Sequence, residues 1–202
     1  MLHYIHSPAK EQISNNPALI MLHGRGADEH DLFGLKEYFN SRFEVYSVRA
    51  PFDFGWGGYT WFELFEDGGV DEESFRSSRE QLLEFIGSVA SNDLYLLGFS
   101  MGAIMSYAVA LTKSASCKGI ACLSGFAPLQ LEDEYKLQEL HNLHVFISHG
   151  INDPVIPITS ARKTKVLLDS SNATVSYTEY SMGHEISEEC LMDLKKWFSH
   201  LV

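Results

Sequence analysis

The sequence predicts an α/β fold, with a mostly parallel central sheet and helices on both of its faces. Two observations carry this prediction. Along the 202 residues, apolar runs of strand length alternate with segments whose apolar residues recur at helical spacing. The strand-length runs are apolar at successive positions, as in strands buried on both faces, which is typical of parallel sheets. No repeat, low-complexity tract or linker divides the chain, so we expect residues 1–202 to form a single domain.

The expected strands are short apolar or β-branched runs that stop at turn-forming residues. A short edge strand is expected at Leu2 and Tyr4. The other strands are expected at residues 17–22, 43–48, 94–97, 119–124, 143–148 and 174–180. Open α/β sheets bind ligands at the carboxyl ends of their strands, so the residues that follow each strand are the candidates for function.

Four segments have helical character. Residues 71–90 open with three acidic residues, which suit the positive end of a helix, and then repeat apolar residues at helical spacing. Residues 160–168 and 186–201 show the same period. Residues 103–111 are apolar throughout, which indicates a buried helix.

A Gly-x-Ser-x-Gly motif joins the strand at 94–97 to the helix at 103–111. This arrangement is the sequence form of a nucleophile elbow, in which the chain reverses within very few residues. Gly98 and Gly102 carry no side chain where the backbones crowd, and Ser100 is exposed at the tip. We therefore predict Ser100 as a catalytic nucleophile, the alternative being an ordinary strand-to-helix turn.

Asp153 and His184 each follow a predicted strand. Asp153 comes after the strand at 143–148, in an Asn-Asp-Pro segment that also forms turns by itself. His184 comes after the strand at 174–180, beside a glycine. A carboxylate that orients an imidazole, which in turn activates a serine, forms a catalytic triad. The chain order Ser100, Asp153, His184 is the order expected of such a triad in an α/β-hydrolase.

Residues 23–28, His-Gly-Arg-Gly-Ala-Asp, follow the strand at 17–22. Two glycines within three residues leave backbone N–H groups free to face a ligand, as an oxyanion hole requires. We assign the two donors to the backbone amides of Arg25 and Met101, the alternative being a glycine turn without a ligand. His23 is expected to be a structural hydrogen-bonding residue.

Residues 51–65 are rich in aromatic residues and glycine and are expected to form a loop. One interpretation is a mobile apolar rim, to which Trp61 and Phe62 contribute, that accepts an acyl or aryl group. The other is a loop whose own aromatic side chains cover the core. Phe126 and Met182, which follow other strands, are the remaining candidates for substrate binding.

Composition excludes several other classes of function. A formal net charge of −12 repels phosphate, so nucleic acid and anionic membrane surfaces are not expected as partners. Three cysteines without a Cys-x-x-Cys motif indicate buried thiols rather than a disulfide framework or a zinc site. The three histidines His141, His144 and His149 share neither a helix nor a supporting carboxylate, so no metal is expected.

The N-terminus has no basic flank followed by an apolar segment, and no run reaches membrane-spanning length. We therefore expect a cytoplasmic protein without stable membrane insertion. The last helix and the aromatic loop offer patches on which two copies could pair as a homodimer.

Five segments together resemble the phospholipase/carboxylesterase family of small α/β-hydrolases, which includes the acyl-protein thioesterases. They are residues 23–28, 98–102, 123–126, 149–157 and 183–185. The resemblance implies an α/β-hydrolase fold without a large cap domain and no cofactor. It also implies a serine carboxylic ester hydrolase that acts on small-molecule esters with short to medium acyl or aryl groups.

Residues 25–31 and 49–51 are more similar to the bacterial carboxylesterase branch of this family than to the eukaryotic thioesterases. One departure is Met101, where many members carry glutamine. Because only the backbone amide of this residue contacts the oxyanion, the departure bears on acyl preference rather than on activity.

Three alternative functions remain at this point. A member of the same family could hydrolyse acyl thioesters or lysophospholipids. A serine peptidase would need an acidic anchor for a peptide amine, for which Glu63, Glu66 and Asp67 are available, but no β-propeller or large cap accompanies them. A non-catalytic binding protein of this fold would normally lack one member of the triad.

Overall fold

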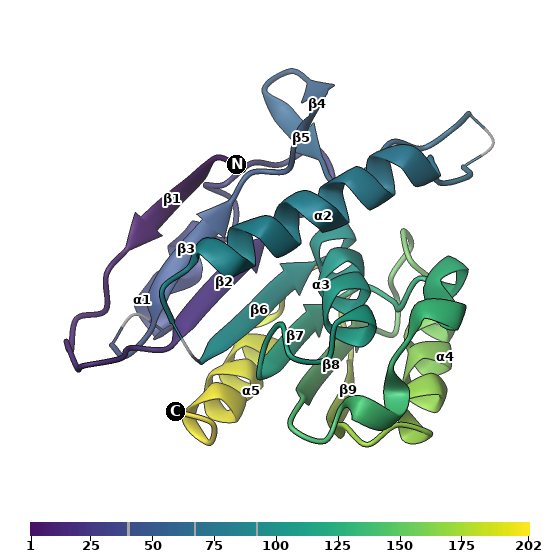
Figure 1. The fold of residues 1–202 in the computed structure, drawn as a ribbon. Coiled ribbons are helices and arrows are strands. Elements are labelled where there is room, and N and C mark those ends of the chain that lie inside the picture. The colour runs from purple at the N-terminus through teal and green to yellow at the C-terminus, as the bar shows by residue number, and fades with distance from the viewer. Residues whose placement is uncertain (40, 67, 92) are drawn as a thin grey trace.

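The computed structural model describes residues 1–39, 41–66, 68–91 and 93–202. Its central feature is a seven-stranded sheet with the spatial order β1-β3-β2-β6-β7-β8-β9 (Figure 1). These strands are β1 (Tyr4–Ser7), β2 (Ala18–Leu22), β3 (Glu44–Val48), β6 (Leu94–Phe99), β7 (Gly119–Leu123), β8 (His144–Gly150) and β9 (Thr174–Tyr180). β1 pairs antiparallel with β3 at one edge, and the other neighbouring strands pair in parallel.

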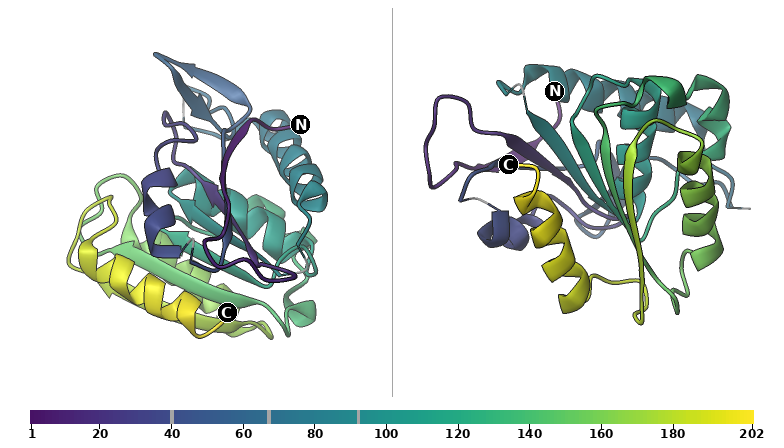
Figure 2. Two further views of the ribbon diagram at one scale, coloured as in Figure 1. Left: turned by 90° about the vertical axis from the view of Figure 1, so that its left-hand side faces the viewer. Right: turned by 90° about the horizontal axis from the view of Figure 1, so that it is seen from below.

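Helices cover both faces of the sheet. They are α1 (Lys36–Phe39), α2 (Glu72–Ser88), α3 (Met101–Thr112), α4 (Ile158–Asp169) and α5 (Glu188–Ser199), with 3-10 turns η1 (Phe33–Leu35), η2 (Leu129–Glu134) and η3 (Leu137–Glu139). α2, α3 and α4 lie on one face, and α1 and α5 lie on the other (Figure 2). The predicted fold class, a mostly parallel sheet between two helical layers, is confirmed.

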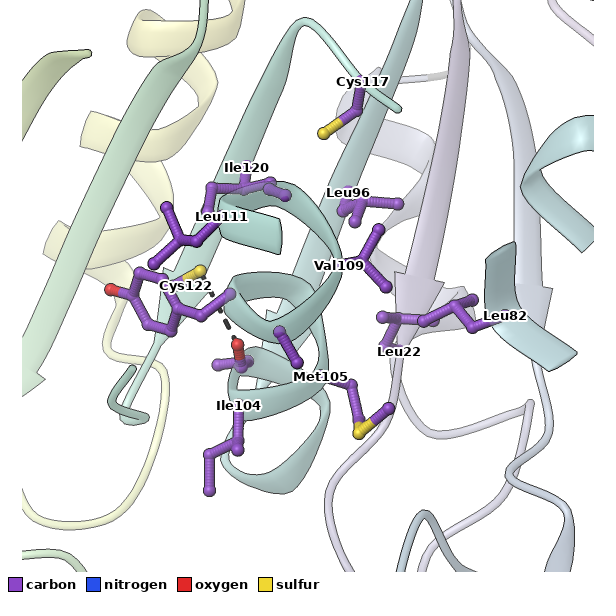
Figure 3. Packing of buried hydrophobic residues seen from close by; sticks show 14 of the residues in the cluster. Leu22, Leu82, Leu96, Ile104, Met105, Val109, Leu111, Cys117, Ile120 and Cys122 are labelled. Carbon is purple, nitrogen blue, oxygen red and sulfur yellow. Dashed lines mark hydrogen bonds between the residues drawn. The ribbon is translucent and has the colours of Figure 1, made fainter. Parts of the chain in front are cut away.

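The larger core cluster surrounds α3. Every residue of this helix except its last is buried, so it presents apolar side chains to the sheet and to the neighbouring α2 alike. Ile104, Val109 and Leu111 of α3 lie in one cluster with Leu96 of β6 and Ile120 of β7 (Figure 3). A close-packed helix of this kind holds the end of β6, where the serine motif lies, in a fixed position.

Residues 51–65 differ from the loop expected from the sequence. They contain an antiparallel hairpin of β4 (Phe52–Gly55) and β5 (Gly58–Thr60), which stands beyond the carboxyl ends of the parallel strands (Figure 1). Gly55 and Gly57 have φ values of 85° on either side of Trp56, which is fully exposed. The glycines permit the left-handed turn at the tip, so this aromatic segment reverses as a hairpin.

All three cysteines are buried free thiols, as the sequence predicts. Burial raises the pKa of Cys117 to about 12 and that of Cys190 to about 11, so neither carries the thiolate needed for reactivity. In the part of the chain that the structure describes, no helix combines the length and the apolar character needed to cross a membrane.

Candidate active site

Ser100 alone forms the turn between β6 and α3. Its backbone has φ 54° and ψ −116°, a left-handed conformation that residues other than glycine rarely adopt. Its N–H donates to the carbonyl of Leu123 at 2.8 Å. A Cβ atom on Gly98 would lie 2.4 Å from the backbone of Gly102, and one on Gly102 would lie 2.0 Å from the carbonyl oxygen of Leu22. These two positions therefore exclude every side chain, and the crowding holds Ser100 at the tip.

The structure brings Ser100, His184 and Asp153 into one hydrogen-bonded chain. The Ser100 Oγ lies 2.9 Å from His184 Nε2, and His184 Nδ1 lies 2.7 Å from Asp153 Oδ2. A carboxylate only accepts, so Nδ1 carries the hydrogen and Nε2 accepts from the serine hydroxyl. The three side chains follow β6, β8 and β9, and they meet at one edge of the sheet.

The loops that carry Asp153 and His184 are bonded to each other through their backbones. The N–H of Ile151 donates to the carbonyl of Tyr180 at 2.9 Å, and the N–H of Asn152 donates to that of Met182 at 3.1 Å. These bonds extend the pairing of β8 with β9 past the strand ends, and they fix the separation of the carboxylate and the imidazole.

Asp153 is an ionised carboxylate in a buried setting. Burial by itself acts to raise its pKa, but the hydrogen bond from His184 and the amides of Ile156 and Val155 outweigh burial and lower the pKa. Its Oδ1 accepts from these two amides at 2.9 and 2.8 Å, and its Oδ2 accepts from His184. The carboxylate therefore stays charged at neutral pH.

The loop after β2 passes beside the serine. A Cβ on Gly24 would lie 3.5 Å from the Cβ of Ser100 and 3.2 Å from the ring of Phe99. His23 anchors this loop: its Nδ1–H donates to the carbonyl of Gly24 at 2.7 Å, and its Nε2 accepts from the N–H of Ala50 at 3.0 Å. Burial lowers the pKa of His23, so the buried ring stays neutral in the structural position that the sequence indicates.

An ion pair with a buried carboxylate holds the same loop from its other end. The Nε and Nη2 of Arg49 donate to the two carboxylate oxygens of Glu29 at 2.6 and 2.5 Å, and the Glu29 side chain is only 2% exposed. The guanidinium lies 4.5 Å from the ring centre of Tyr59 in β5. Hydrogen bonds from Arg49 lower the pKa of Glu29 to about 2. Sequence reasoning missed this pair, because residues twenty positions apart in two loops leave no local pattern.

The hairpin of β4 and β5 is joined to the loop after β2. The N–H of Gly26 donates to the carbonyl of Tyr59, and the N–H of Tyr59 donates to that of Ala27, both at 2.8 Å. A Cβ on Gly58 would lie 2.2 Å from the carbonyl oxygen of Gly26, and the Arg25 guanidinium lies 4.5 Å from the ring centre of Phe54. The hairpin and the candidate oxyanion loop therefore form one connected unit.

Two of the predicted substrate-binding residues lie in the core. Trp61 is fully buried, and its Nε1–H donates to the carbonyl of His23 at 3.0 Å. Phe62 is buried with its ring centre 5.1 Å from that of Phe75 in α2. The interpretation of these two residues as an accessible rim is wrong, because both side chains pack in the core; the other interpretation, aromatic side chains that cover the core, describes them. The exposed aromatic residues of the segment are instead Phe54, Trp56 and Phe65.

The other two candidates for substrate binding, Met182 and Phe126, differ in their exposure. Met182 is buried in the cluster that packs against α5. Phe126 is half-buried and lines a cavity of about 190 Å³ with Leu129 and Lys163, among others. Met101 is also buried, and its sulfur lies 3.2 Å from the Thr60 hydroxyl oxygen, so its side chain faces the hairpin.

A family model described as phospholipase/carboxylesterase matches residues 5–202. The chain belongs to the phospholipase/carboxylesterase family. Acyl-protein thioesterase 1 of Kluyveromyces lactis is 28% identical over 98% of this chain and 97% of its own length. The Bacillus cereus carboxylesterase structure superposes with a TM-score of 0.88 at 26% identity, covering 100% of this chain and 95% of that one. The Zea mays acyl-protein thioesterase 2 structure, at 21% identity and a TM-score of 0.80 over 98% of both chains, shares the fold.

Family membership confirms the resemblance read from the sequence, and it gives the chain an α/β-hydrolase fold without a large cap domain. The description of the family and the names of these relatives indicate hydrolysis of esters and thioesters. The relatives include proteins named for carboxylesterase and for thioesterase activity, so family membership defines the class of reaction but not the substrate.

Proposed function

We propose that this protein is a serine carboxylesterase that hydrolyses short to medium acyl or aryl esters through an acyl-enzyme. The observation that carries the proposal is the hydrogen-bonded chain from the Ser100 hydroxyl through His184 to the buried carboxylate of Asp153. A serine hydroxyl is a weak nucleophile unless an adjacent base takes its proton, and His184 Nε2 lies within hydrogen-bonding reach of that proton.

In the proposed reaction, His184 takes the Ser100 proton as the serine oxygen attacks the ester carbonyl. The resulting imidazolium is stabilised by Asp153, and it then protonates the departing alcohol. Water enters, gives a proton to His184, and releases the acid from the acyl-enzyme by the same steps in reverse order. Asp153 does not change its protonation state in this cycle; it orients the ring and stabilises its charge.

The negative oxygen that forms during attack needs hydrogen-bond donors. We assign them to the backbone amides of Arg25, in the loop beside Ser100, and of Met101, the first residue of α3. The N-terminus of α3 adds the positive end of the helix dipole at the same point. Loss of one such donor typically lowers turnover by about 10²–10³-fold.

Hydrolysis of acyl thioesters is the second candidate. It is favoured by the similarity to acyl-protein thioesterase 1 of Kluyveromyces lactis over nearly the whole chain, and the same serine, histidine and oxyanion donors would serve it. A peptidase has less support, because the acidic residues Glu63 and Glu66 are exposed to solvent. Asp67, the third acidic candidate, lies outside the described residues.

A substrate panel with the purified protein tests the proposal. Wild type is expected to hydrolyse p-nitrophenyl esters from acetate to octanoate, and to turn over the matching S-acyl thioesters more slowly and dipeptide amides not at all. Ser100→Ala should abolish hydrolysis and labelling by a fluorophosphonate probe while retaining the circular dichroism spectrum. Ser181→Ala, which changes an exposed serine in the loop of His184, is the matched control and should behave as wild type. Turnover that survives in Ser100→Ala would refute the assignment of the nucleophile.

A further inference from the structure

His149 is a fully buried histidine beside the carboxylate of Asp153. It lies next to the last residue of β8, and both side chains are 0% exposed. Its Nε2 lies 2.8 Å from the carbonyl oxygen of Ile156 and 3.3 Å from Asp153 Oδ2. Its other ring nitrogen, Nδ1, is buried without a hydrogen-bond partner in the described part of the chain.

The contact with Ile156 determines which nitrogen of His149 carries the hydrogen. A carbonyl oxygen only accepts, so Nε2 is the protonated nitrogen. The positive end of this N–H group therefore lies against Asp153 Oδ2, the oxygen that also accepts from His184. Because the two side chains are shielded from water, this dipole acts on the carboxylate more strongly than it would at the surface.

His149 also holds the loop that surrounds the carboxylate. The peptide groups of Ile156 are bonded in two directions, with the N–H donating to Asp153 Oδ1 at 2.9 Å and the carbonyl accepting from His149. Loss of the His149 donor would free the Ile156 carbonyl and loosen the segment that presents the amide to Asp153. One imidazole thus touches the carboxylate directly and supports one of its backbone donors.

Packing alone does not explain a histidine at position 149. The buried, unpartnered Nδ1 is a cost to folding that an apolar ring of similar shape avoids. We propose that His149 is a positioning residue, which fixes the Asp153 carboxylate and moderates how strongly this carboxylate holds a proton on His184. The proposal rests on the proposed role of Ser100, His184 and Asp153.

Other charged and titratable groups border this cluster. Glu179 of β9 is the register partner of His149, and it is held by Arg162 of α4 with two bonds of 2.8 Å and by the Tyr177 hydroxyl at 2.7 Å. Its pKa is lowered to about 2, chiefly by Arg162, so its charge is constant from pH 5 to 9. Glu185 follows His184 and accepts from the N–H of Gly183. His184, hydrogen-bonded to Asp153 at 2.7 Å, is the group followed in the experiments below.

The sign of the effect follows from the hydrogen bonds. When the Nε2–H of His149 is removed, the Asp153 carboxylate has one fewer positive group beside it and becomes more basic. It then stabilises the protonated ring of His184 more strongly, so His184 gives up its proton at higher pH. The acidic limb of the kcat/KM profile should move to higher pH, because His184 must be unprotonated to act as a base.

Variants of His149 test this proposal. His149→Phe and His149→Leu remove the donor, whereas His149→Gln offers an amide N–H to the Ile156 carbonyl. With p-nitrophenyl acetate, the Phe or Leu variant should shift the acidic limb upward by about one pH unit and lower kcat about tenfold, as expected for the loss of a hydrogen-bond donor close to a charge. The Gln variant should bring both the position of the acidic limb and kcat most of the way back to the wild-type values. His144→Phe, at the opposite end of β8, is the control and should match wild type.

A second measurement does not depend on turnover. The titration of the His184 ring is followed by NMR in the Ser100→Ala background, with and without His149→Phe or His149→Leu, whichever retains the wild-type circular dichroism spectrum. A higher titration midpoint in the double variant supports the proposal even if the ester substrates fail. An unchanged midpoint, or an acidic limb that stays at its wild-type position while kcat falls, overturns it and leaves His149 with a packing role alone.

Discussion

Replacing Glu29 by glutamine tests whether its ion pair with Arg49, beside the candidate oxyanion loop, stabilises the fold. Glu29 has a pKa of about 2 against an ordinary value of 4.5, mainly because Arg49 donates to both of its oxygens. One pKa unit corresponds to about 1.4 kcal/mol, so hydrogen bonding to Arg49 favours the ionised form in the folded chain by roughly 3 kcal/mol at most. We expect Glu29→Gln to lower the free energy of unfolding at pH 7 by about 2 kcal/mol, because the carboxylate is buried whereas the Arg49 side chain is 29% exposed and solvent screens part of the interaction.

The pH dependence of this loss gives a second check. Because the pKa is lower in the folded state, the stabilisation is fully present above the ordinary value of 4.5 and is lost as pH falls through about 2. Urea unfolding of both proteins at pH 7, 5.5, 4 and 3 should therefore give a difference that is constant at the two higher values. The difference should then shrink at pH 4 and further at pH 3.

Glu179 supplies a matched control. It accepts two bonds from Arg162 at 2.8 Å and its pKa is also about 2, but the Arg162 side chain is 54% exposed. Solvent screens such a pair and little of its interaction reaches the free energy of unfolding, so Glu179→Gln should cost much less than Glu29→Gln. Equal losses in the two variants, or a Glu29→Gln loss that does not change between pH 7 and pH 3, would refute the reasoning.

Three further substitutions follow from the site. Trp61→Ala should lower the free energy of unfolding by about 3–5 kcal/mol in urea titrations, because the indole is buried, while the acyl-length profile stays that of wild type. Gly102→Ala should yield insoluble protein, measured as the soluble fraction on expression, because its Cβ would lie 2.0 Å from the Leu22 carbonyl oxygen; Gly87→Ala, in open space on α2, should remain soluble. Asp153→Asn should keep the fold but lower kcat for p-nitrophenyl acetate by about 10⁴-fold, since an amide supports the wrong tautomer of His184. A loss below tenfold would contradict that role.

Much of the sheet could be predicted because its strands are continuous apolar runs. β9 was predicted with the boundaries that the structure has, and the helix at α2 was predicted within two residues at each end. The positions of Ser100, Asp153 and His184 could also be inferred, because each lies in the loop that follows a strand and parallel strands end at the same edge.

The hairpin and the ion pair could not be read in the same way. Gly55 and Gly57 are typical of a loop in the sequence. In the structure their left-handed backbone allows the chain to reverse as a hairpin. Trp61 was interpreted as part of an accessible rim because aromatic residues in a loop suit both a core and a binding surface. For His149 the sequence predicts only that it binds no metal and that it belongs to the segment 149–157 of the family resemblance; a useful signal is its place just before Gly150 at the end of a buried strand. Contacts such as Glu29 with Arg49 depend on how two loops meet in space.

The backbone of Ser100 has a consequence for how this protein responds to selection. A residue with a side chain at φ 54° and ψ −116° is strained by about 1–3 kcal/mol, and glycine adopts this conformation without that strain. Ser100→Gly should therefore give an inert protein that withstands heat better than the parent chain. Selection for heat resistance alone would enrich such inactive variants. Directed evolution of this protein therefore has to select for turnover in every round.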